Sequence, residues 1–201
     1  MSDLEEKKID TSNNLFLPYL LKVKTIVLGE STPKTFTKIV FFISLMIAFI
    51  FEIWNSISFF ILKSPDFLKK HKQVDVKAII ELRGKELGFN NNDFYQKLEF
   101  FHLSSIILWG IILIGLIFLW RQKKWSIYLI IIALLTYISI LLFSLSPTYF
   151  IEDLTLFDKI NISILFILML IQHFVPIQTI DSVTLEEKSD MLIDDENNME
   201  H

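Results

Sequence analysis

The stretch FFISLMIAFIFEIWNSISFFIL, from Phe41 to Leu62, is almost wholly apolar and is long enough to cross a lipid bilayer. A hydrocarbon core about 30 Å thick is crossed by roughly 20 apolar residues at a rise of about 1.5 Å per residue. Three more apolar blocks of this kind follow along the chain. The sequence therefore predicts four transmembrane helices, over about 39–62, 100–120, 125–145 and 160–177.

The clustering of apolar residues into blocks supports this prediction more strongly than the overall composition does. Hydrophobic residues make up 52% of the 201 residues, which is close to the value for soluble proteins, so the arrangement in blocks is the informative feature. The chain contains no cysteine, which excludes disulfides, thiolate metal sites and iron–sulfur clusters. It also lacks a glycine-rich phosphate loop and an HExxH pattern. We therefore predict no cofactor and no metal ion.

The loops set the predicted topology. The segment RQKK, 121–124, is so short that the spans on either side of it must be antiparallel neighbours. The longer segment 63–98 has room to fold, with Pro65 suited to the first turn of one helix and Asp75 suited to cap another. We expect an all-α membrane protein: a four-span antiparallel helical bundle with a small helical, extracytoplasmic insertion between the first two spans.

The segments around the transmembrane domain, 39–177, are more polar. We predict a disordered leader over 1–14, an interfacial or juxtamembrane segment over 15–38 and an acidic disordered tail over 178–201. The three basic residues of RQKK face the cytoplasm under the positive-inside rule, although the basic residues of the 63–98 segment oppose this assignment. The prediction is an integral protein of the plasma (inner) membrane with both termini in the cytoplasm.

Glu52 places an ionisable group in the middle of the first span. It shares one helical stripe with Ser44 and Ala48, so we expect it to face the other helices. Counting depth along each span brings Trp109 and Tyr137 to the same level, where they can donate hydrogen bonds to Glu52. The predicted intramembrane polar cluster consists of Glu52, Asn55, Ser56, Trp109, Thr136 and Tyr137.

Two interpretations of Glu52 stay open. In the first, a neutral carboxyl group hydrogen-bonds neighbouring helices and fixes their packing. In the second, the carboxyl group carries protons or coordinates a cation, because an ionisable residue within a span marks a functional site by default.

His102 lies near the outer end of the second span. It differs in depth from His173 by about 16 Å, so the two imidazoles cannot share one haem. We instead predict an outer polar cluster of His102, Ser105 and Asn161, next to Asn55.

These patterns favour a small non-enzymatic accessory or scaffolding subunit of a membrane assembly. The first alternative is a channel or carrier in which Glu52 is a protonatable gate. The second is an enzyme that acts on lipid head groups in a cleft near His102, which requires another titratable group beside that imidazole. The expected partners are the lipid bilayer and either another membrane protein or a second copy of the chain, with no nucleic acid.

Overall fold

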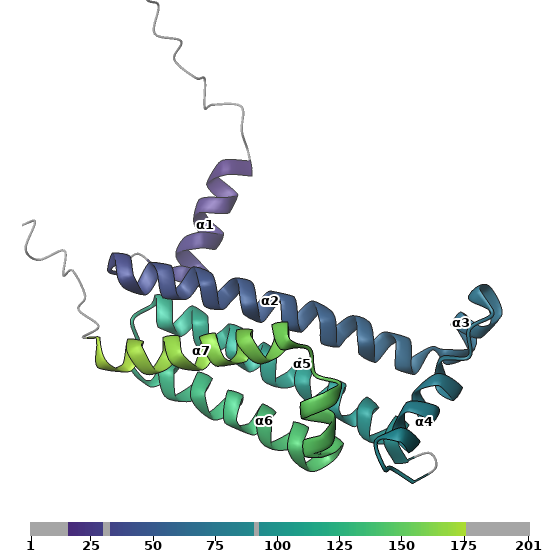
Figure 1. Ribbon diagram of the computed structural model, residues 1–201. Coiled ribbons are helices and arrows are strands. Elements are labelled where there is room, and N and C mark those ends of the chain that lie inside the picture. Colours follow the sequence, from purple (N-terminus) through teal and green to yellow (C-terminus); the bar gives the residue numbers. More distant parts are fainter. Residues whose placement is uncertain (1–15, 30–32, 91–92, 176–201) are drawn as a thin grey trace, which may run out of the picture.

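The computed structural model describes residues 16–29, 33–90 and 93–175. These residues are almost all helical and contain no strand, which confirms the predicted all-α class. In chain order the helices are α1 (Phe16–Leu28), α2 (Thr35–Lys63), α3 (Pro65–Lys72), α4 (Val76–Glu86), α5 (Asp93–Trp120), α6 (Trp125–Glu152) and α7 (Leu156–Phe174) (Figure 1).

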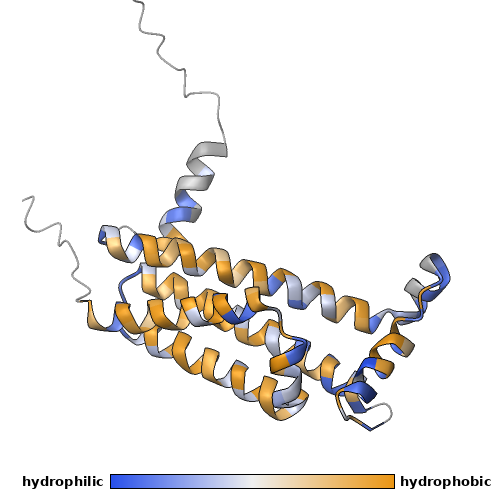
Figure 2. Ribbon diagram, viewed as in Figure 1, coloured by the Kyte–Doolittle hydropathy of each residue, from blue (hydrophilic) through white to orange (hydrophobic). Residues whose placement is uncertain are grey.

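Four of the described helices, α2, α5, α6 and α7, are long and apolar enough to cross a membrane. Figure 2 shows apolar residues along most of their length, whereas α3 and the loops are mostly hydrophilic. Each predicted span falls within one of these helices as far as the described residues extend, except that the fourth helix ends one residue before Val175. Residues 176–177 of the fourth predicted span lie outside the described residues. The predicted leader over 1–14 and the predicted tail over 178–201 lie outside the described residues.

Helix α5 is central to the packing. It contacts both α2 and α6 extensively, while α7 makes fewer contacts, which are with α2 and α6. The chain turns back at each end of the group: α3 and α4 lie at one end, and α1 and the α5–α6 loop lie at the other (Figure 1). Helix α7 is the least buried of the four long helices.

An aromatic group occupies the middle of the helix packing. Trp109 on α5 is fully buried and stacks on Phe51 of α2, with ring centroids 4.4 Å apart and an interplanar angle of 11°. Tyr137 on α6 meets the Trp109 ring edge-on at 5.5 Å. Offset stacked and edge-on pairs of this kind are the favoured arrangements of aromatic rings, so these contacts fix α2, α5 and α6 at this level.

Helix α6 contains a break near the place where the sequence predicts that the third span ends. Ser146 has φ 75° and ψ 157°, values that lie outside helical geometry. Pro147 follows it, and a proline disfavours the helical conformation of the residue before it. Regular helix therefore ends at Leu145, and a short further helical segment leads to Glu152. A positive φ with an extended ψ is a region that residues other than glycine rarely adopt, so Ser146 is strained.

The segment between α2 and α5 folds as two short helices. The Asp75 carboxylate caps α4 by accepting a hydrogen bond from the Ala78 amide at 3.1 Å. Arg83 on α4 bonds Asp153 at 2.6 Å, next to the α6–α7 connection. Its hydrogen bonds to Asp153 and Glu86 raise the pKa of the Arg83 guanidinium above its ordinary value. This network holds α4 against the corner where α6 turns into α7.

Helix α1 leaves the group and runs crosswise to α2 (Figure 1). Its last turn is held by Arg121, whose guanidinium donates a hydrogen bond to the carbonyl oxygen of Ile26. An arginine in this position satisfies a carbonyl that the helix end leaves unpaired. The interfacial placement of residues 15–38 stays a prediction.

Candidate functional site

Glu52 lies at the edge of the buried stripe of α2. Ser44, Ala48 and Asn55 are buried, but Glu52 is half-buried and Ser56 is exposed. Phe51, one position earlier, is the residue that contacts Trp109 and Tyr137. Depth counting gives the level of a residue along a helix, but one position also rotates the side chain by about 100°. This rotation turns Phe51, and not Glu52, toward α5 and α6.

The six residues of the predicted intramembrane cluster do not form one hydrogen-bonded group. Among the described residues, Glu52 has no hydrogen-bond partner, and its Oε2 is shielded and unpaired. The Nε1 of Trp109 is likewise buried and makes no hydrogen bond of normal geometry, although the side chain of Tyr137 lies beside it. Thr136 is exposed and its hydroxyl donates to the carbonyl of Ile132 in its own helix at 2.8 Å. The predicted hydrogen bond from Glu52 to Trp109, Thr136, Tyr137 or Asn55 is therefore absent from the described part of the chain.

Asn55 and His102, in contrast, are brought together. The Asn55 Nδ2 donates to the carbonyl of Phe51 at 2.8 Å, which fixes the orientation of the amide. Its Oδ1 then lies 2.9 Å from Nδ1 of His102. Because an amide oxygen can only accept, Nδ1 carries the hydrogen, and in the neutral imidazole Nε2 keeps a lone pair. Asn55 thus orients a histidine whose second nitrogen has no hydrogen-bond partner among the described residues.

The other two members of the predicted outer cluster point elsewhere. The Ser105 hydroxyl is buried and donates to the Phe101 carbonyl at 2.7 Å. The Asn161 amide donates to the Phe157 carbonyl at 2.8 Å. Both bonds return to the side chain's own helix, which is a common way for a polar side chain in an apolar helix to satisfy itself.

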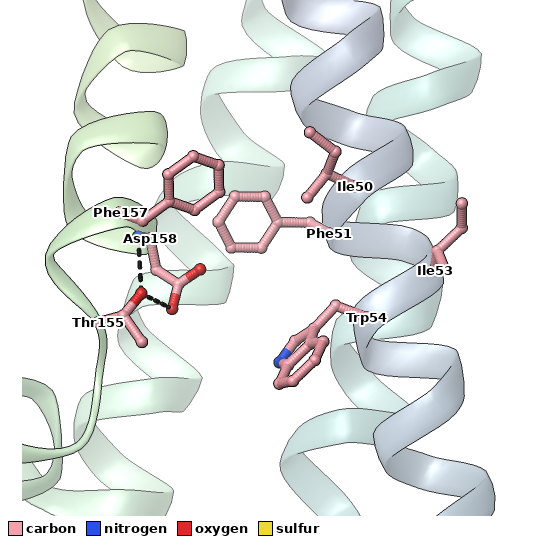
Figure 3. A pocket seen from close by; sticks show the side chains of 7 residues that line it. All are labelled: Ile50, Phe51, Ile53, Trp54, Thr155, Phe157 and Asp158. Carbon is pink, nitrogen blue, oxygen red and sulfur yellow. Dashed lines mark hydrogen bonds between the residues drawn. The ribbon is translucent and has the colours of Figure 1, made fainter.

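The groups that do surround His102 come from the connection between α6 and α7. A pocket of about 120 Å³ is lined by His102 and Asn55 together with residues of the connection, among them Asp153, Thr155 and Asp158. A larger pocket of about 420 Å³ adjoins it between α2 and the start of α7 (Figure 3). The two share Phe51, Trp54, Thr155 and Asp158. We call the pair the α2–α7 cleft.

Thr155 and Asp158 build the start of α7. The Thr155 hydroxyl accepts a hydrogen bond from the Asp158 amide at 3.2 Å and donates to Asp158 Oδ2 at 2.6 Å. This reciprocal pair resembles a capping box, with an aspartate at the third helical position. Asp158 has no Lys or Arg partner within the described ranges, whereas the carboxylate of Asp153 is held by Arg83. Asp158 is therefore the unpaired negative charge of the α2–α7 cleft.

Sequence reasoning missed Asp153, Thr155 and Asp158 as neighbours of His102. The signal available was the TLFD spacing of Thr155 and Asp158 just before an apolar run, which indicates where a helix begins. That pattern places the residues at the start of α7, but it does not tell how the connection folds over α2 and α5.

The described residues contain no group of three or more His, Asp or Glu side chains that could hold a metal ion. Comparison with protein-family models, with curated proteins and with solved structures finds no match to this chain. The class of protein therefore follows from the four apolar helices, which are compatible with a multi-pass membrane protein.

Proposed function

We propose that this chain is a small non-enzymatic accessory subunit of a membrane assembly and that Glu52 contacts a helix of its partner. The single observation that carries the proposal is the carboxyl group of Glu52, which is half-buried on α2 with a shielded oxygen and no hydrogen-bond partner among the described residues. A buried polar group left unpaired costs about 1–3 kcal/mol. Because the carboxyl group is half-exposed, its rotation brings this oxygen to a donor on a partner helix, which removes the cost and favours assembly over the isolated chain.

The surroundings of Glu52 support a contact with another helix. Phe49, three residues earlier on the same side of α2, is exposed on the outside of the helix group. It provides apolar surface next to the carboxyl group, and a polar group within an apolar helix face is a common association signal in membranes. The partner that fits is a membrane helix with a hydrogen-bond donor or a basic side chain at the level of Glu52.

Purification in a mild detergent, followed by mass spectrometry, tests this role. We expect the natural chain to co-purify with a membrane protein at a fixed ratio. Glu52→Leu should lose that protein, because leucine cannot accept the donor's hydrogen bond, while Glu52→Gln should keep it in part. Retention of the same partner by Glu52→Leu contradicts the proposal.

The carrier alternative makes the opposite prediction for glutamine. Glu52→Gln keeps size and hydrogen-bonding capacity but cannot release a proton or hold a cation. Under the accessory role, proteoliposomes that contain the natural chain or Glu52→Gln should show the same background flux of protons and cations across an imposed gradient. Flux in the natural chain that vanishes in Glu52→Gln at unchanged thermal stability contradicts the accessory role and favours the carrier.

We also propose an antiparallel bundle with both termini in the cytoplasm of the plasma membrane and α3 and α4 outside. The support is the charge of the α5–α6 loop, RQKK, together with Arg121, which ties α1 to that same end. A reporter that is active only in the cytoplasm should be active when it is fused after His201. A reporter that is active only outside the cytoplasm should be active when it is inserted after Asn90. The reverse result at both sites overturns this orientation.

One observation favours a second candidate function, an enzyme that acts on lipid head groups. That hypothesis requires a titratable group beside His102, and Asp153 and Asp158 line the same pocket as the imidazole. Asn55 orients His102 so that Nε2 can accept a proton from a substrate hydroxyl or water. Incubation with mixed lipids and mass spectrometry of the products tests it. Turnover that is lost in His102→Gln supports the enzyme, and no turnover by the natural chain counts against it.

A further inference from the structure

We propose that the α2–α7 cleft binds an amphiphile that carries a protonated or quaternary ammonium group, with the ammonium beside Asp158 and the hydrocarbon tail along the apolar mouth of the cleft. This inference does not depend on the proposed accessory role, because it rests on the cleft and not on Glu52.

The shape of the cleft suits a molecule with two chemically different ends. The larger pocket is bordered by Ile50, Ile53 and Trp54 of α2 and by Phe157 of α7, which are all exposed. It lies between two helices that can cross a membrane, so its open side faces the hydrocarbon region when they do. The smaller pocket lies next to it and contains polar groups of Asn55, His102 and Asp158. An apolar entrance that leads to a polar interior is the arrangement that an amphiphile fills.

The charge of the cleft selects the head group. One oxygen of the Asp158 carboxylate accepts the Thr155 hydroxyl, and the other has no partner among the described residues. Figure 3 shows the carboxylate facing Phe51 and Trp54 across the pocket. A carboxylate opposite aromatic rings stabilises a cation by both charge attraction and cation–π interaction. Phosphate or carboxylate groups next to Asp158 are repelled, because no Lys or Arg is among the described residues that line either pocket. Arg83 is held by Asp153, and the ammonium of Lys159 donates to the Ile151 carbonyl.

His102 is a second, independent observation that points to a ligand. Its side chain is only 8% exposed, yet it lines the small pocket and its Nε2 makes no hydrogen bond within the described part of the chain. A neutral imidazole nitrogen that has no protein partner keeps a lone pair that can accept a hydrogen bond from a bound donor. A hydroxyl or N–H of the head group can supply that donor, while Asn55 holds the imidazole in place from the other side.

A simpler role for Asp158 is to stabilise the start of α7 through its negative charge and its bond to Thr155. This role accounts for the oxygen that Thr155 contacts. It accounts neither for the free oxygen facing Phe51 and Trp54 nor for the unpaired nitrogen of His102. Asp158→Asn separates the two roles, because asparagine keeps an oxygen that can accept from Thr155 and removes the negative charge.

The test uses the full chain in dodecyl maltoside and native mass spectrometry to count bound probe. The probes are decyltrimethylammonium below its micellar concentration, tetramethylammonium, which lacks a tail, and decanoate, which has a tail and a negative charge. We expect saturable one-to-one binding of decyltrimethylammonium only. Equal binding of tetramethylammonium shows a site for free cations and overturns the amphiphile. Equal or tighter binding of decanoate overturns the choice of an ammonium group.

Paired variants assign the binding to this cleft. Asp158→Asn and Trp54→Leu should each weaken decyltrimethylammonium binding by about tenfold or more, as expected for loss of an ion pair or a desolvated cation–π contact. Their controls are Asp93→Asn, the same change in the first turn of α5, and Trp125→Leu, an exposed tryptophan that lines neither pocket. Both controls should bind normally. Unchanged binding in folded Asp158→Asn or in folded Trp54→Leu overturns the assignment.

Discussion

Gly115→Ala is expected to destabilise the helix packing by about 1–3 kcal/mol relative to Gly110→Ala, the range measured for an extra carbon in a well-packed core. A Cβ at Gly115 on α5 lies 2.7 Å from Cγ1 of Ile130 on α6, which is too close for two carbon atoms. Ile130 is fully buried, so it has little room to move away. The two helices must therefore separate locally or Ile130 must leave its preferred rotamer.

Gly110 is the matched control on the same helix, because a Cβ there meets nothing within 4 Å. Both substitutions gain the same helix propensity, so the difference between them isolates the crowding. The measurement is the free energy of unfolding by SDS titration in mixed micelles. A double-mutant cycle with Ile130→Ala should show that the two changes cost less together than their sum. Equal stability of the two glycine variants contradicts the close α5–α6 packing.

Gly84→Ala is expected to push α4 away from α5. A Cβ at Gly84 lies 2.6 Å from the Cβ of Phe94, an atom that cannot move without the backbone. Phe94 is itself buried against Phe89 and Tyr149. The cost is again about 1–3 kcal/mol, and it falls on the attachment of α4 more than on the four long helices.

Hydrogen exchange followed by mass spectrometry tells whether Gly84→Ala loosens α4 alone or also the packing of the long helices. We expect faster exchange over α4 and little change in the centres of α5 and α6. Gly110→Ala should leave exchange over α4 unchanged. Unchanged exchange over α4 in Gly84→Ala means that α4 does not pack on Phe94 as described.

The helices were predictable because their signals lie within short segments. Apolar blocks of sufficient length indicate the four long helices, and Pro147 indicates the break in α6. The ends were less predictable, because a helix can continue beyond its apolar block. Helix α5, for example, begins at Asp93, well before the predicted start of its span near residue 100. Hydropathy indicates which residues prefer the lipid environment. The ends of a helix depend instead on where its backbone hydrogen bonds stop, which can lie beyond the apolar block.

The candidate site was only partly predictable. The helical period placed Ser44, Ala48 and Asn55 on the buried face of α2, but the boundary of that face passes between Phe51 and Glu52. The packing of α2 against its neighbouring helices sets this boundary, and a single sequence does not reveal that packing. Asp158 and His102 line one pocket only because the α6–α7 connection lies next to α2 and α5, and no local sequence pattern indicates such a long-range contact.

A photo-reactive residue beside Glu52 tests the accessory role most directly. Benzoylphenylalanine at position 49, on the exposed face of α2 beside Glu52, should cross-link one membrane protein in intact cells, and Glu52→Leu in the same chain should abolish the product. The same probe at position 143, the highly exposed Phe143 of α6, is the control and should give no protein product. A product at position 49 that persists with Glu52→Leu, or no protein product at that position, contradicts the account.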